Sequence, residues 1–270
     1  MSDIFQSIDR LDAEALQKVI DRLEFRGTYV PFVEMREAYL DRLDLPAKPH
    51  VCELGCGTGV VSRAIAARPG FDGTVHGTDL SQSLVAEAKR RARSEGMENV
   101  TFSADAEGGS GQLEGSCDVV ILHTLISHVA SVAPVLAEAS RIAKPGATIV
   151  LFDGDYASLT CHCGNASEDA RIVSSLLGAI VANLTIMREL PRLMQEAGLV
   201  LDGVQGDLLV EAGEPEFFDS LIETYVPMAV RAGMLADHEA DAWIGGFRTA
   251  ARERSFFGSC NFVTYFAKAV

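Results

Sequence analysis

Residues 51–59, Val-Cys-Glu-Leu-Gly-Cys-Gly-Thr-Gly, are the segment that most restricts how this chain can fold. A short apolar run that leads directly into closely spaced glycines predicts a buried strand, a tight turn and then a helix. Glycine has no Cβ and adopts positive φ readily, so Gly55, Gly57 and Gly59 allow a sharp turn and the close approach of a small ligand to the backbone. The segment therefore predicts a β-α unit with a ligand-binding turn.

The glycine spacing does not fit the two common nucleotide fingerprints. The third glycine comes one position too early for the dinucleotide pattern G-x-G-x-x-G, and no Lys-Ser or Lys-Thr pair follows as in a phosphate-binding P-loop. A nicotinamide oxidoreductase is therefore disfavoured.

Composition limits the partners and the cellular setting. The chain has 270 residues, 48% of them apolar, which is enough for one enlarged α/β domain or for a domain with a cap. A net charge of −15 disfavours a nucleic-acid partner, because such binding depends on clustered Lys and Arg. The polar N-terminus and the lack of an apolar run of about 20 residues predict a cytoplasmic protein without membrane insertion. Six cysteines scattered through the chain indicate reduced thiols rather than a disulfide framework.

The hydrophobic pattern alternates between strand-like and helix-like segments. Two helices are expected before residue 45, followed by strands and helices in turn, which predicts an α/β fold with a doubly wound, mostly parallel seven-stranded sheet. We expect four segments: an N-terminal helical part of a cap (1–45), a core (46–155), a helical insertion (156–198), and C-terminal strands with a second helical insertion at about 214–255 (199–270).

Acidic residues follow the predicted strands at informative positions. Asp79 ends the second strand, 20 residues after Gly59, where a carboxylate can accept hydrogen bonds from both hydroxyls of a ribose. Asp105 ends the third strand and could accept from an adenine amino group. Glu53 lies in the first strand, where a buried acid needs a donor or a cationic partner. Together they indicate a ligand with a sugar, a base and a cationic group.

Five segments around these residues, in their order and spacing, resemble the motifs of class I S-adenosylmethionine-dependent methyltransferases, in particular the methyltransferases of ubiquinone and menaquinone biosynthesis. The resemblance covers about residues 48–155, with a weaker part from Leu190 to Leu199. The segments that carry it are Glu53-Leu-Gly-Cys-Gly-Thr-Gly59, Gly77-Thr-Asp-Leu-Ser81, Asp105-Ala106, Cys117-Asp-Val-Val120 and Lys144-Pro-Gly146.

The resemblance implies a Rossmann-like core that binds S-adenosylmethionine and releases S-adenosylhomocysteine. It places the turn Gly55-Cys56-Gly57-Thr58-Gly59 under the methionine part of the cofactor and Asp79 on the ribose. It also implies that Asp105 and the Ala106 amide read the adenine, that Leu80 packs on the ring, that the His123 carbonyl meets the cofactor ammonium, and that Arg26 pairs with its carboxylate.

The acceptor site is less constrained. His123 and His128 follow the fourth strand, and either could act as a general base; His128 is favoured because the backbone of His123 has another role. Further candidates for acceptor contacts, each with a structural role as the alternative, are Tyr29, Asp153, Asp155, Tyr156, Asn183, Arg192, Tyr225 and Asn261.

Two other features bear on function. Cys161-His162-Cys163 has no matching second pair of ligands, so no metal site is predicted. The apolar helical stretches at 176–190 and 217–232 could form a lid over the acceptor, or could pack in a core or in a homodimer.

We therefore predict an enzyme that transfers a methyl group from S-adenosylmethionine to an O, N or C atom of a small, partly apolar molecule, such as a secondary metabolite or a quinone-like compound. In-line displacement at the sulfonium needs mainly alignment of the reactants. The alternative is a protein of the same fold that binds the cofactor without transferring the methyl group.

Overall fold

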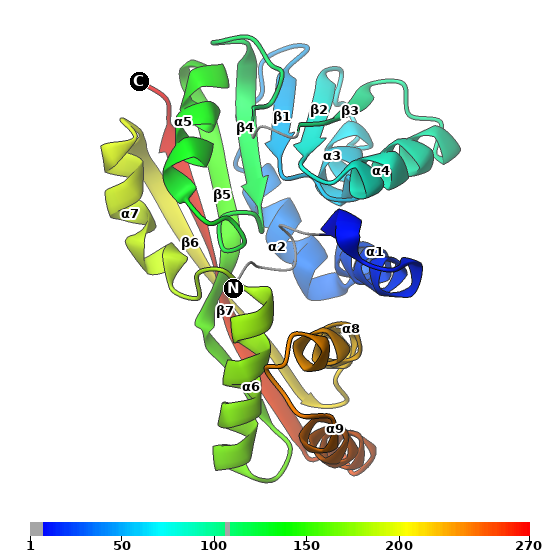
Figure 1. The fold of residues 1–270 in the computed structure, drawn as a ribbon. Coiled ribbons are helices and arrows are strands. Elements are labelled where there is room, and N and C mark those ends of the chain that lie inside the picture. The colour runs from blue at the N-terminus through cyan, green and yellow to red at the C-terminus, as the bar shows by residue number, and fades with distance from the viewer. Residues whose placement is uncertain (1–7, 106–108) are drawn as a thin grey trace.

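The computed structural model describes residues 8–105 and 109–270, and its central feature is a seven-stranded sheet (Figure 1). The strands are β1 (His50–Leu54), β2 (Thr74–Asp79), β3 (Val100–Ala104), β4 (Cys117–His123), β5 (Ala143–His162), β6 (Val200–Gly213) and β7 (Phe256–Lys268). The helices are α1 (Ala13–Thr28), α2 (Val30–Leu40), α3 (Val60–Ala66), α4 (Gln82–Ser94), α5 (Val132–Ile142), α6 (Ala166–Ile180), α7 (Ile186–Glu196), α8 (Phe217–Arg231) and α9 (Asp237–Arg252).

The order of the strands fixes where a ligand can bind. The sheet runs β3-β2-β1-β4-β5-β7-β6, with β1 to β5 parallel and β7 antiparallel to both of its neighbours. The chain leaves β1 toward β2 and β3 and later returns on the other side of β1 with β4 and β5. Ligands of doubly wound sheets bind at the carboxyl ends of the strands at such a switch point. The predicted mostly parallel seven-stranded α/β sheet is confirmed.

Local signals explain several element boundaries. Ser81 caps α4 by accepting a hydrogen bond from the Leu84 amide at 3.1 Å, as its position before the helix predicts. Pro31 lies in the first turn of α2, where a missing amide hydrogen has no cost. Gly59, with φ +77°, precedes α3 in the left-handed region that glycine tolerates.

One expected boundary was wrong. We predicted that the helical insertion begins at residue 156, but residues 156–162 continue β5, and the first helix of the insertion begins at Ala166. The register of β5 against β7 shifts between Asp155 and Thr160. Because of this irregularity, Tyr156 and Leu159 are both buried although they are three residues apart in the sequence, and this spacing is typical of a helix.

Helices cover both faces of the sheet. On one face α5 and α7 pack on β4, β5 and β6 around a core that contains Leu122, Leu136 and Leu190. On the other face α3 and α4 cover β1 to β3, while α6, α8 and α9 gather beside the long ends of β5, β6 and β7 (Figure 1). The cap is therefore built on an extension of the same sheet.

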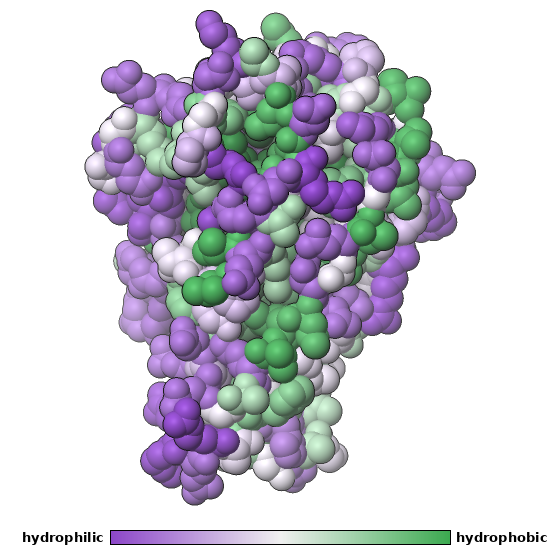
Figure 2. Space-filling view, turned by 180° about the vertical axis from the view of Figure 1, so that it is seen from behind, coloured by the Kyte–Doolittle hydropathy of each residue, from purple (hydrophilic) through white to green (hydrophobic). Residues whose placement is uncertain are grey.

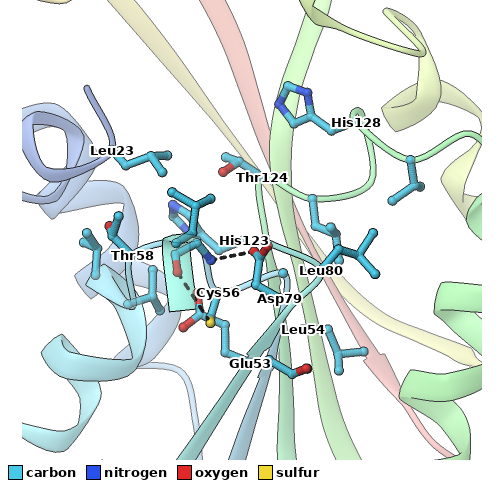
Figure 3. Close-up of a pocket in the computed structure, with 18 of the residues that line it drawn as sticks. Leu23, Glu53, Leu54, Cys56, Thr58, Asp79, Leu80, His123, Thr124 and His128 are labelled. Carbon is cyan, nitrogen blue, oxygen red and sulfur yellow. Dashed lines mark hydrogen bonds between the residues drawn. The ribbon is translucent and has the colours of Figure 1, made fainter. Parts of the chain in front are cut away.

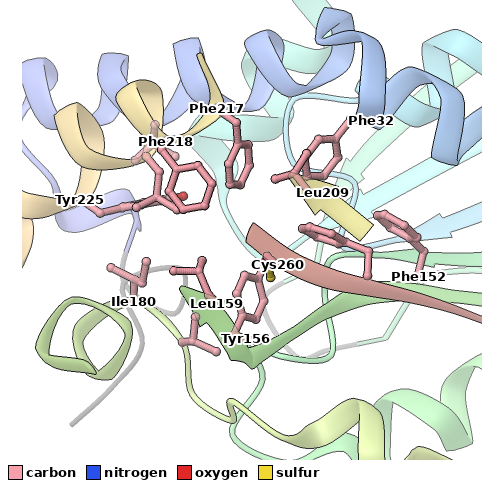
Figure 4. Packing of buried hydrophobic residues seen from close by; sticks show 14 of the residues in the cluster. Phe32, Phe152, Tyr156, Leu159, Ile180, Leu209, Phe217, Phe218, Tyr225 and Cys260 are labelled. Atoms are coloured by element: carbon pink, nitrogen blue, oxygen red, sulfur yellow. The ribbon is translucent and has the colours of Figure 1, made fainter. Parts of the chain in front are cut away.

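An aromatic cluster joins the cap to the core (Figure 4). The ring of Phe32 in α2 stacks on Phe217 in α8 with centroids 5.5 Å apart, and it meets the edge of Phe262 in β7 at 5.0 Å. Arg22 in α1 donates to the Phe217 carbonyl at 3.3 Å. Offset and edge-to-face aromatic pairs stabilise beyond the area they bury, so the cap and the core form one continuous interior.

No helix within residues 8–105 and 109–270 combines the length and the apolar character needed to span a membrane.

The glycine turn provides a stability test. A Cβ on Gly59 would lie 2.5 Å from Cζ of Phe102, whereas a Cβ on Gly70, which has a similar φ of +82°, would meet no atom within 4 Å. Both Gly→Ala variants should lose about 1–2 kcal/mol from left-handed strain, and Gly59→Ala should lose about 1–3 kcal/mol more from overpacking. Urea denaturation measures the free energy of unfolding of both variants. Equal losses would contradict the packing described here.

Candidate functional site

A pocket of about 440 Å³ opens at the carboxyl ends of β1, β2 and β4 (Figure 3). Figure 3 shows Glu53, Cys56 and Asp79 grouped together and His128 lying beyond Thr124. The pocket brings together most of the residues that the sequence predicted for a cofactor, together with His128. Those that line it are Arg26, Glu53, Gly55, Cys56, Gly57, Thr58, Asp79, Leu80, Asp105, His123 and His128.

The glycine turn forms one wall. Gly55, Gly57 and Gly59 have φ of +70°, +53° and +77°, all in the left-handed region. A Cβ on Gly55 would lie 2.5 Å from Cδ1 of Leu125, which also lines the pocket. The Cys56 amide donates to the Thr78 carbonyl at 2.9 Å and so ties the turn to the end of β2. Gly59 itself faces Phe102 and is not among the lining residues.

Asp79 connects the turn to the next strand. One carboxylate oxygen accepts from the Gly57 amide at 2.8 Å, and the other accepts from the Ser81 amide at 2.9 Å. Burial raises the pKa of Asp79, against the opposing effect of these two amides. The carboxylate is thus fixed at the pocket wall, next to the half-exposed Leu80.

Glu53 is a buried acid whose hydrogen bonds come from Ser62. Its side chain is 2% exposed and accepts from the amide and the hydroxyl of Ser62. Burial raises its pKa to about 8, because the two bonds from Ser62 only partly offset the desolvation and Asp79 adds like charge. A cationic ligand group beside Glu53 would favour its ionised form.

Arg26 offers the complementary charge. Its Cζ lies 4.4 Å from the centroid of the Phe32 ring, and its Nε and Nη2 are buried without a hydrogen-bond partner among the described residues. The buried hydroxyls of Thr58 and Thr78 also lack a partner in that part of the chain. Unpaired buried donors are costly, so these groups fit a polar ligand that carries an anionic group.

His123 is held by the core. Its Nδ1 shares a hydrogen bond of 3.0 Å with the Tyr39 hydroxyl, and its ring stacks on Phe152 with centroids 4.5 Å apart. Burial, with Arg26 and Arg36 nearby, holds the pKa of His123 well below its usual value. A ring that stays neutral and is packed in this way is poorly suited to take up a proton.

A hydrogen bond orients the ring of His128. Its Nδ1 lies 3.2 Å from the carbonyl oxygen of Ile180, which can only accept, so this bond requires a hydrogen on Nδ1, and a neutral ring bonded in this way has its lone pair on Nε2. The His128 amide donates to the Leu125 carbonyl at 3.0 Å. This arrangement suits Nε2 to accept a proton.

Asp153 fixes the loop that carries His128. It is fully buried, and its oxygens accept from the amides of Ser127 at 3.0 Å and Gly154 at 2.8 Å. From the cap, the Asn183 amide donates to the Ser127 carbonyl at 3.0 Å. Burial raises the pKa of Asp153, and a positive charge on His128 would lower it. Asp153 and Asn183 thus support the loop from outside the pocket and do not line it.

The other residues predicted for the acceptor also do not line this pocket. The Tyr29 hydroxyl donates to Glu211 at 2.7 Å, and Asp155 pairs with Arg188 at 2.9 Å. Of the remaining four, Tyr156 and Tyr225 are buried, and Asn261 is exposed on β7. Arg192 lies on an exposed part of α7, where it pairs with Glu189 and Glu196.

Some site residues lie outside the prediction or outside the structure. Thr124, with φ +53°, lines the pocket directly after β4, and Arg36 lines it from α2, where it donates to the Gly27 carbonyl at 3.2 Å. The sequence offers one signal for Arg36 as a site residue, because it is a charged residue among the apolar positions of a predicted helix. Nothing in the sequence indicates the left-handed backbone of Thr124. Ala106, predicted to read the adenine, lies outside the described residues.

The Cys161-His162-Cys163 segment is structural in the described fold. The two sulfurs lie 3.7 Å apart, and Nδ1 of His162 is 3.2 Å from the buried Asp169, which also accepts from the Trp243 indole at 2.8 Å. Among residues 8–105 and 109–270 no group of three or more His, Cys, Asp or Glu side chains is arranged to hold a metal ion.

Comparison with known proteins agrees with this geometry. A family model described as a methyltransferase domain matches residues 47–200. A ubiquinone biosynthesis O-methyltransferase of Methylococcus capsulatus is 34% identical over 97 residues, which cover 36% of this chain and 40% of that protein. Matches to the first curated relatives span about half of their length or less.

Solved structures share the fold. YcgJ of Bacillus subtilis aligns with a TM-score of 0.62 at 16% identity, over 87% of this chain and 98% of that one. Geranyl diphosphate C-methyltransferase of Streptomyces coelicolor, solved with Mg²⁺, geranyl diphosphate and S-adenosylhomocysteine, aligns with a TM-score of 0.55 at 19% identity, over 88% and 79% of the chains. With a family model that matches more than half of its residues and the turn, acids and sheet order described above, the chain belongs to the class I S-adenosylmethionine-dependent methyltransferases.

Proposed function

We propose that this protein transfers a methyl group from S-adenosylmethionine to a hydroxyl group of a small, partly apolar molecule. The observation that carries the proposal is one pocket that joins Glu53, Asp79 and Arg26 to the imidazole of His128. The O-methyltransferase named among the relatives supports an oxygen acceptor. The net charge of −15 argues against a nucleic-acid acceptor.

The residues around the glycine turn fit the cofactor. Glu53 would bind the ammonium and Arg26 the carboxylate of its amino-acid part, while Asp79 would accept from the ribose hydroxyls. Leu80 and Asp105 would contact the adenine. When bound, the cofactor supplies an electrophilic methyl group, and the walls of the pocket hold the reactants in line and exclude water.

The acceptor would lie toward His128. Leu125 and Val129, close to His128 in the chain, line the pocket and favour an apolar body with a hydroxyl group. Nε2 of His128 would take the hydroxyl proton as the oxygen attacks, and the resulting imidazolium would be stabilised by the nearby Asp153 carboxylate. Asp153 therefore acts as a positioning residue.

Removing the ribose contact should weaken cofactor binding. Asp79→Ala should raise the Kd of S-adenosylmethionine about 100-fold, because two hydrogen bonds to a carboxylate are worth together about 3 kcal/mol. The matched control is Asp72→Ala. Asp72 is an exposed acid just before β2, and among the contacts described for residues 8–105 its carboxylate accepts only from the Lys48 amide. Calorimetric titration measures both affinities, and circular dichroism confirms folding. An unchanged affinity in Asp79→Ala would refute the ribose assignment.

Removing the base should slow transfer without weakening cofactor binding. With methyl-labelled S-adenosylmethionine and a panel of phenols, alcohols and a metabolite extract, the wild type should pass label to an acceptor. His128→Ala should lower the rate about 100-fold or more, with the cofactor Kd within about threefold of the wild type. The control is His162→Ala, which removes a half-exposed histidine at the cap and should keep the full rate.

Two results would count against this function. A full rate in His128→Ala would reject its role as base. Tight cofactor binding with no label transfer to any acceptor would favour the alternative, a protein of this fold that binds the cofactor without catalysing methyl transfer.

A further inference from the structure

The edge strand β6 exposes an unusual number of apolar side chains. The structure places β6 at one end of the sheet, so within residues 8–105 and 109–270 only one of its two edges is paired, with β7. Val204, Leu208 and Val210 are 57%, 62% and 50% exposed, and Phe257, which pairs with Ala212 from β7, is 43% exposed. Long apolar edge strands invite pairing with another strand, and proteins usually cover or charge them.

In the part of the chain that the structure describes, Val204, Leu208 and Val210 lie on a face of β6 that leaves their side chains exposed. Leu209 and Glu211 point to the opposite face, where α8 and α9 pack, and both are buried. The exposed positions alternate with them, as expected for a strand with one covered face. Seen from behind, apolar atoms lie near the middle of the lower half of the molecule, with hydrophilic atoms beside and below them (Figure 2).

We propose that β6 pairs antiparallel with β6 of a second copy of this chain, about a twofold axis at Leu208. The regular part of β6 begins after the register shift between Leu201 and Gly203 and ends at Gly213, so Leu208 lies at its centre. Pairing about this residue uses the whole regular segment. The interface is isologous and closed, as most homodimer interfaces are.

The charges of β6 favour this register over the two adjacent ones. With the axis at Leu208, the opposed residues on the exposed face are Leu208 with Leu208, Gly206 with Val210, and Val204 with Ala212, and none of them is charged. Moving the axis to residue 207 would place two Asp207 side chains opposite each other, and moving it to residue 209 would place Asp207 opposite Glu211. Like charges directly opposed across strands are destabilising.

Charge also favours a second copy at this face rather than elsewhere. Each chain carries a net charge of −15, so two copies repel over most of their surfaces. Among the neighbours of these apolar residues on β7 and β5, Ser259, Asn261 and Thr160 are uncharged, and the charge of Asp155 is paired with Arg188. This patch is therefore a place where two copies can approach closely, and added salt should strengthen the dimer by screening the remaining repulsion.

Crosslinking tests both the partner and the register. Residues directly opposed across antiparallel strands have Cα atoms about 4.5–5.5 Å apart, within the range of a disulfide. Leu208→Cys should therefore form a covalent dimer under mild oxidation. Val204→Cys is the matched control, because its two copies would lie about 27 Å apart along the strands and should not crosslink. The wild type, oxidised in the same way, controls for the native cysteines.

Sedimentation equilibrium provides the independent measurement. The wild type should be a dimer, and Leu208→Lys should raise its dissociation constant at least tenfold by placing two ammonium groups at the axis. Leu113→Lys, at a leucine that is 78% exposed in a loop before β4, should leave the dimer intact. A wild type that is monomeric at all concentrations, or a dimer that Leu208→Lys does not weaken, would overturn the proposal, as would equal crosslinking through residues 204 and 208.

Discussion

The pair of hydrogen bonds between the glycine turn and the end of β2 is the constraint on which the rest of the site depends. The Asp79 carboxylate holds the Gly57 amide, and the Thr78 carbonyl holds the Cys56 amide. These bonds fix a turn whose three glycines lie in the left-handed region, and they fix Asp79 itself. A single local arrangement thus sets the shape of the pocket wall and the position of its principal carboxylate.

Charged side chains in the pocket differ from those elsewhere in the protein, which form ion pairs. Arg63 and Arg91 share Glu24, and Arg68 pairs with Glu37 and Asp41. In the pocket, by contrast, Glu53 is buried without a cationic partner at bonding distance among the described residues, and Arg26 has buried nitrogens without acceptors there. Buried groups of this kind cost stability when they have no partner. A ligand that carries both an ammonium and a carboxylate would satisfy them together.

Much of the fold and the cofactor part of the site could be predicted from the sequence, because their signals are local. Glycine spacing, a capping serine and acids at strand ends each act within a few residues. The acceptor contacts could not be predicted in this way. Asp153 lies inside β5, whereas Asp79 is the last residue of β2. The carboxylate of Asp153 accepts from the Ser127 amide, in a loop that the cap residue Asn183 also holds. The extension of β5 could not be predicted either, because the irregular register between Asp155 and Thr160 gives the buried residues of this strand a helix-like spacing.

In the proposed function, the glycine-turn pocket receives the cationic amino-acid part of S-adenosylmethionine next to Glu53. With a pKa of about 8, Glu53 is mostly protonated at pH 7 in the protein alone, and an adjacent cation should ionise it. Binding should therefore strengthen as the pH rises toward 8.

Calorimetric titration at pH 7 in two buffers of different ionisation enthalpy measures the protons released on binding. We predict release of about one proton by the wild type, from the linkage between ligand binding and ionisation. We predict none by Glu53→Gln, and none when the ligand is 5′-methylthioadenosine, which lacks the amino-acid part. Tight binding of S-adenosylmethionine by the wild type without proton release would contradict this account of the site.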